Sequence, residues 1–118
     1  MAKRKCKLIG GKFYMAYGGH KHPAHIFAYD SKHKTYVSIK FGTTRGRHMI
    51  EIHPIQKNVA KSYVHSRPFE GTRNDYGDRE MQGLSIDERD IAIIEIIKGR
   101  KPTQSKRAKL RYKNKKCR

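Results

Sequence analysis

The sequence predicts a mainly-β domain: a small barrel or strongly bent sheet of about five short strands, closed by one late helix. Short aromatic or β-branched runs recur before residue 66, and glycine, proline or polar turns separate them. One apolar stretch with helical spacing follows near residue 91. A basic segment, residues 99–118, ends the chain, and its composition predicts a disordered tail behind a domain formed by residues 1–98.

The first strands are predicted where aromatic segments lie between turn residues. Residues 11–18 are bounded by glycines, and residues 24–29 end at a polar turn. Residues 35–41 alternate with period two, which places Tyr36, Ser38 and Lys40 on one face and Val37, Ile39 and Phe41 on the other. Residues 48–52 and 62–65 complete the set, since a proline follows each of them closely.

The segment 69–83 contains three glycines and no periodicity, which predicts a loop. Ser85 and Glu88 then match a capping box, which predicts the start of a helix. Isoleucines recur near helical spacing up to a C-capping Gly99, although their density also suits a buried strand. The expected core comprises Ile26, Phe27, Val37, Ile39, Phe41, Ile50, Ile52, Val64, Ile91 and Ile94.

Charge is the main indicator of function. The 118 residues carry a formal net charge of +18, and phosphate backbones are the commonest polyanions available to such a protein. The tail supplies part of the excess, but the remainder of the chain is also basic. A membrane surface is the rival polyanion, but neither an amphipathic basic helix nor a lipidation signal is present. Nucleic acid is therefore the expected partner, and membrane binding is not expected.

Other sequence features predict the cellular location and argue against disulfides and metal sites. No secretory signal or apolar segment of membrane-spanning length is found, which predicts a cytoplasmic protein. Cys6 and Cys117 lie at opposite ends, so neither a disulfide framework nor a zinc site of structural spacing is expected. His20, His22 and His25 form a cluster without a nearby cysteine or carboxylate, which favours chance over a metal site. We expect no cofactor.

Residues 18–52 carry a family resemblance. They contain Gly18-Gly-His-Lys-His-Pro-Ala-His-Ile-Phe27, Tyr36-Val-Ser-Ile-Lys-Phe-Gly-Thr-Thr44 and Met49-Ile-Glu-Ile52, and later Leu84-Ser-Ile-Asp-Glu88 precedes the apolar helix. This arrangement resembles the MazF/PemK family of toxin ribonucleases, and the likeness covers roughly residues 10–98. The resemblance implies an SH3-like barrel and metal-independent RNA cleavage, in which a 2′-hydroxyl attacks its own phosphate.

The resemblance also implies site residues, with one departure. The family places an arginine before the proline and a threonine or serine at the end of the second long strand. Thr43 or Thr44 matches the second position, but His22 occupies the first. Histidine titrates near neutrality and can serve as base or acid, while Lys21, Arg45 or Arg47 could supply fixed positive charge. The candidate catalytic residues are His22, Thr43, Thr44 and Arg45. Loss of the arginine is equally consistent with a relative that binds RNA without cutting it.

Further basic residues are candidates for contact with nucleic acid. The loop from Thr43 to His48 offers backbone amides and guanidinium groups suited to phosphate, although an ordinary hairpin turn has the same composition. The complete set is Lys12, Lys21, Arg47, His48, Arg67, Arg73, Lys106, Arg107, Lys109 and Arg111.

Two other functions remain open. One is a non-catalytic nucleic-acid-binding accessory protein, ribosome-associated or encoded by a mobile element. The other is a basic inhibitor of an acidic protein partner. RNA is favoured over DNA by the family resemblance alone, which also raises an acidic antitoxin-like partner. The expected core is modest, so a homodimer is a further option.

Overall fold

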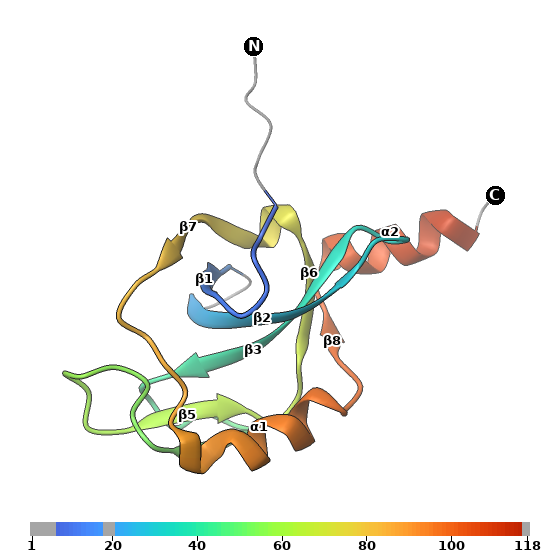
Figure 1. The fold of residues 1–118 in the computed structure, drawn as a ribbon. Helices are drawn as coiled ribbons and strands as arrows, with labels where there is room; N and C mark the ends of the chain where they lie inside the picture. Colours follow the sequence, from blue (N-terminus) through green and yellow to red (C-terminus); the bar gives the residue numbers. More distant parts are fainter. Residues whose placement is uncertain (1–6, 18–20, 117–118) are drawn as a thin grey trace.

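The computed structural model describes residues 7–17 and 21–116, and only the backbone for residues 114–116. Figure 1 shows the strands wrapped into a bent sheet, with one helix beneath it and a second helix projecting from its side. The order of elements is β1 (Phe13–Ala16), β2 (His22–Asp30), β3 (Thr35–Gly42), β4 (Met49–Ile52), β5 (Ser62–His65), β6 (Phe69–Thr72), a 3-10 turn (Arg73–Asp75), β7 (Tyr76–Met81), a 3-10 turn (Glu88–Asp90), α1 (Ile91–Lys98), β8 (Thr103–Gln104) and α2 (Lys106–Lys116).

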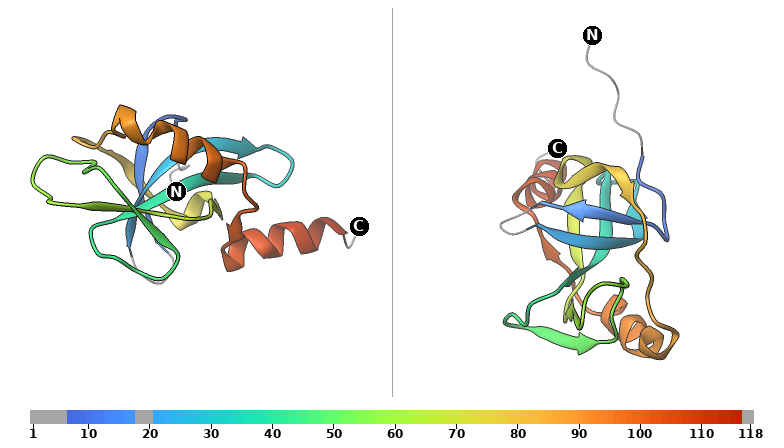
Figure 2. Two further views of the ribbon diagram at one scale, coloured as in Figure 1. Left: turned by 90° about the horizontal axis from the view of Figure 1, so that it is seen from below. Right: turned by 90° about the vertical axis from the view of Figure 1, so that its left-hand side faces the viewer.

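Strand β3 organises the sheet. Its first half pairs with β6, from Thr35 opposite Thr72 to Ser38 opposite Phe69, and its last residues pair with β5. Its other edge pairs with β2, and the path continues through β1 to β7. Because β5 and β6 share one edge of β3, the sheet bends around an interior without closing (Figure 2). The prediction of a mainly-β, barrel-like fold is confirmed, with eight strands in an open sheet.

The bend encloses two apolar clusters. The tyrosine core lies among β1, β2, β3, β6 and β7, and the isoleucine core lies between the sheet and α1. The tyrosine core comprises Leu8, Tyr14, Ala16, Ala24, Ile26, Tyr36, Phe69 and Tyr76. The isoleucine core comprises Phe13, Ile39, Phe41, Ile52, Ile55, Val64, Ile94 and Ile97.

Two details of the predicted core are wrong. Tyr36 and Ser38 are buried beside Tyr76, whereas Val37 is only half-buried, so β3 has no solvent face of the kind its alternation indicates. The cause is the bend, which covers both faces of this central strand. Ile91 is 48% exposed, because it opens α1 on the side away from the sheet.

The prediction of a loop over residues 69–83 is wrong for residues 69–81, which form β6, a 3-10 turn and β7. Two glycines of this segment mark close packing, whereas Gly83 has a φ of 77° and open space around it. A Cβ at Gly71 would lie 2.9 Å from the Asp75 side chain, and one at Gly77 would lie 3.1 Å from the Tyr17 hydroxyl. Glycine at positions 71 and 77 therefore leaves room for neighbouring side chains, an alternative to a turn that composition alone does not distinguish.

The helix at residues 91–98 is confirmed, but its predicted start is wrong. Asp87, not Ser85, caps the preceding 3-10 turn by accepting a hydrogen bond from the Arg89 amide. The Ser85 amide donates to the Ile55 carbonyl oxygen, which holds this residue in an extended segment. Gly99 ends the helix as predicted.

Residues 99–116 differ from the predicted disordered tail. Strand β8 pairs with β6 in parallel, and α2 follows it (Figure 1). Two buried carboxylates of the body bind α2: Glu70 contacts the Tyr112 hydroxyl at 2.6 Å, and Asp75 contacts Arg107 at 2.8 Å. Composition could not show these partners, because they lie more than 30 residues away along the chain. None of the described helices is long and apolar enough to cross a membrane.

Candidate active site

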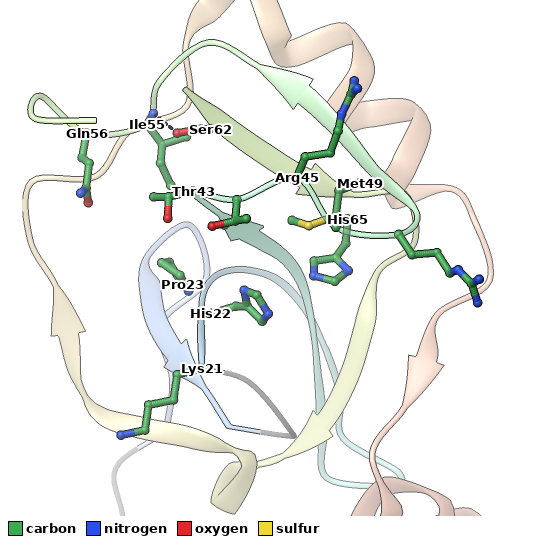
Figure 3. Close-up of a pocket in the computed structure, with 14 residues that line it drawn as sticks. Lys21, His22, Pro23, Thr43, Arg45, Met49, Ile55, Gln56, Ser62 and His65 are labelled. Carbon is green, nitrogen blue, oxygen red and sulfur yellow. Dashed lines mark hydrogen bonds between the residues drawn. The ribbon is translucent and has the colours of Figure 1, made fainter. Parts of the chain in front are cut away.

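A pocket opens where β2 begins and where β3 and β5 end. We call it the histidine pocket; its volume is about 590 Å³, a size suited to a small ligand. Figure 3 shows His22 and His65 facing one another below Thr43, with Met49 beside them. The lining residues are Lys21, His22, Pro23, Gly42, Thr43, Thr44, Arg45, Gly46, Arg47, Met49, Ile55, Gln56, Ser62 and His65. All four residues predicted to be catalytic are among them.

The backbone of β3 sets the tautomer of His22. The Nδ1 atom lies 3.1 Å from the Phe41 carbonyl oxygen. A carbonyl only accepts hydrogen bonds, so Nδ1 carries the proton and Nε2 is the basic nitrogen of the neutral ring. A Cβ at Gly42 would lie 3.4 Å from Nδ1 and 3.2 Å from Met49. The absence of a side chain at Gly42 thus makes room for His22 to reach this position.

His65 reaches the same pocket from the other edge of β3. It pairs with Met49 across β4 and β5, and its ring centroid lies 5.2 Å from that of His22, in an edge-to-face arrangement. Burial is the main cause that lowers the pKa of His65 to about 4, and the charges of Lys40 and His22 add to it. His65 is therefore neutral at pH 7, and its buried Nε2 has no hydrogen-bond partner among the described residues.

This depressed pKa predicts acid sensitivity. As pH falls below the ordinary histidine value of 6.5, the unfolded chain protonates His65, but the folded protein does so only near pH 4. The unfolded state binds more protons in that window, so the free energy of unfolding decreases from pH 6.5 to pH 4, by at most about 1.4 kcal/mol per pH unit. His65→Gln should show a shallower decrease in urea unfolding across this range. His48→Asn, at an exposed histidine, should retain the wild-type slope; equal slopes for wild type and His65→Gln would contradict the prediction.

The charged side chains that line the pocket are all cationic. Lys21, Arg45 and Arg47 are exposed at its rim, and no carboxylate occurs among the described residues that line it. Three other cavities of this protein each include an acidic residue: Glu80, Asp75, and the pair Glu51 and Asp90. Lys21 and Arg45 extend outward in Figure 3, so contact with a bound ligand requires them to turn inward. The arrangement suits an anion.

The remaining predicted basic residues lie in four other places. His48 and Arg67 line an adjoining pocket. Lys12 lies 3.9 Å from Glu80 in another cavity, and Arg73 donates to the Tyr76 and Gly77 carbonyl oxygens and to Asp78. On α2, Lys106, Lys109 and Arg111 are exposed, whereas Arg107 holds Asp75. The structure thus brings Lys21 and Arg47 to the histidine pocket and leaves α2 as a separate basic surface.

The histidine cluster does not form a metal site in the described residues. His20 lies outside them, as do Cys6 and Cys117. His22 and His25 line different cavities, because residues three apart on a strand face opposite sides. His53, Asp87 and Asp90 place one potential ligand atom each within 4.8 Å. Protein donors already bind these carboxylates: Arg89 contacts Asp87, and His53 contacts Asp90.

Sequence reasoning missed His65, Ser62 and Gln56. His65 ends a strand that the sequence does predict, but nothing in its spacing from His22 links the two. The pairing of β5 with the edge of β3 opposite β2 joins them. No family model matches the chain, and no curated protein or solved structure matches it either.

Proposed function

We propose that this protein binds RNA in the histidine pocket and cleaves it without a metal ion. The observation that carries the proposal is the pocket's composition: two histidines in edge-to-face contact, two threonines, and a basic rim with no described carboxylate. Phosphodiesters are the common anionic ligands that need both cations and a proton acceptor for reaction. RNA, unlike DNA, supplies its own nucleophile in the 2′-hydroxyl.

The chain's residues have distinct roles in this reaction. Nε2 of His22 accepts the 2′-hydroxyl proton, the 2′-oxygen attacks phosphorus, and the bond from phosphorus to the 5′-oxygen breaks. Water at the open mouth protonates the leaving oxygen. Arg45 and Arg47 offset charge on the phosphorane, and Thr43 and Thr44 donate hydrogen bonds to its oxygens. His65 is a positioning residue: it packs against His22 and, being neutral, does not repel the imidazolium that forms.

The resemblance to the MazF/PemK toxin ribonucleases supports the same reaction class. We propose a divergent member, in which His22 replaces the family's arginine and the rim supplies the cationic charge. Such a toxin-like enzyme would be cytoplasmic, with an acidic antitoxin-like protein as a candidate partner. The exposed lysines of α2 and Arg111 add affinity for the phosphate backbone, since that term depends on charge and not on base identity.

A cleavage assay in chelator tests the proposal. Mixed-sequence RNA should yield fragments with 2′,3′-cyclic phosphate and 5′-hydroxyl ends, detected by mass spectrometry. DNA of the same sequence should remain intact, because it lacks the nucleophile. If no RNA is cleaved, catalysis is excluded, and a binding measurement with the intact RNA then decides whether the non-catalytic RNA-binding function holds.

A further inference from the structure

A second pocket adjoins the histidine pocket. We call it the Arg67 pocket; it has a volume of about 580 Å³ and is lined by Arg47, His48, His65, Ser66, Arg67 and Thr103. Arg47 and His65 line both pockets, so the two cavities are neighbours along one surface. A ligand strand that fills the first pocket can therefore reach the second by passing Arg47 and His65.

The Arg67 pocket has the same charge pattern as the histidine pocket. Arg47 and Arg67 are exposed, and the described lining contains no carboxylate. Arg100 contacts one of the lining residues, since its Nη1 donates to the Ser66 carbonyl oxygen at 2.8 Å. The guanidinium groups of Arg47 and Arg67 and the Ser66 hydroxyl form a donor set for a phosphate group. The Thr103 hydroxyl is not part of this set, because it donates to the Pro68 carbonyl oxygen.

The loop that forms one wall of this pocket is held in a defined conformation. His48 has a φ of 64°, a left-handed conformation that is uncommon for a residue other than glycine. The Ser66 amide donates to the His48 carbonyl oxygen at 2.9 Å and ties the loop to the segment after β5. The loop between β3 and β4 is thus held against the residues that carry Arg67, and Arg47 stays between the two cavities.

We infer that the Arg67 pocket binds the phosphate next to the one held in the histidine pocket. The ligand is then an RNA strand with at least two consecutive phosphates, and a dinucleotide with one phosphate fills only half of the site. This inference rests on the proposed function, because it assumes that the first phosphate lies beside His22. It gives Arg67, already a candidate for contact with nucleic acid, a specific role: binding the second phosphate without touching the reacting atoms.

Binding and cleavage can be measured separately. The probes are labelled, mixed-sequence oligonucleotides of two, three and eight nucleotides with 2′-fluoro ribose, which lacks the nucleophile, followed by fluorescence anisotropy over a salt series. We expect affinity to increase about tenfold from two to three nucleotides, as one added charge-assisted contact allows. Arg67→Gln should remove this increase and reduce the salt slope for the eight-nucleotide probe by about 0.7, the value for one single-stranded phosphate. The matched control is Arg79→Gln, at an exposed arginine that lines neither pocket.

The outcomes separate the two proposals. If Arg67→Gln binds three nucleotides as well as wild type does, the second phosphate site is overturned, whether or not RNA is cleaved. If the Arg67 dependence is found but ribose oligonucleotides of every length stay intact, cleavage fails and the second site stands. If both the second phosphate site and the cleavage reaction are correct, Arg67→Gln should slow cleavage of trinucleotides about tenfold. The same variant should leave dinucleotide cleavage within about twofold of wild type.

Discussion

His22→Asn is expected to lower kcat/KM for RNA cleavage by about 10²- to 10⁴-fold, the usual contribution of one general acid–base group. The asparagine amide nitrogen takes the place of the imidazole Nδ1. It can therefore keep the hydrogen bond to the Phe41 carbonyl oxygen, which spans 3.1 Å in the wild type. What it lacks is a basic nitrogen where Nε2 lies. The substitution removes the chemistry and preserves the contact with the strand.

Controls separate this role from a structural one. The thermal midpoint of His22→Asn should stay close to that of wild type, and added imidazole should restore part of the activity of His22→Ala. His25→Asn is the matched variant on β2, since His25 lines a different cavity. Activity of His22→Asn within twofold of wild type would rule out proton transfer by this residue.

The sequence predicts one half of this site and not the other. His22 and the loop from Thr43 stand close to predicted strand ends, so a family-like pattern and a strand periodicity locate them. His65 joins them only because β3 has β2 on one edge and β5 on the other. Strand order is a property of the whole chain, and a pattern of period two carries no information about which strands are neighbours.

The same limit explains the wrong prediction at the C-terminus. Ten basic residues and no acidic one after Gly99 describe a solvated extension if only local composition is considered. Glu70 and Asp75 alter the outcome: each is only 3% exposed, and each binds side chains from β8 or α2. Both acids lie in the segment predicted as a loop, so neither was expected to be buried or to need a partner.

Asp75→Asn is expected to destabilise the protein by about 3 kcal/mol, because it disrupts a buried carboxylate surrounded by donors. One oxygen, Oδ2, accepts from the Thr72 amide at 2.7 Å and from the Ser105 hydroxyl at 2.6 Å, and Oδ1 accepts from Arg107 at 2.8 Å. An asparagine must turn its NH₂ group toward one of these sets. Either orientation brings donors together and leaves them unsatisfied.

The loss of stability in Asp75→Asn should affect α2 before the rest of the protein. Ser105 caps this helix, since its hydroxyl accepts from the Ala108 amide at 3.1 Å, and Asp75 holds the same hydroxyl. Urea unfolding measures the stability, and trypsin should cleave α2 of Asp75→Asn faster than α2 of wild type. The matched variant is Arg107→Gln. It leaves the Thr72 and Ser105 donors in place and removes a side chain that is 59% exposed, so its cost should be about 1 kcal/mol or less. If both variants unfold at the same urea concentration, the exposed ion pair and not the buried acceptor holds α2 on the body.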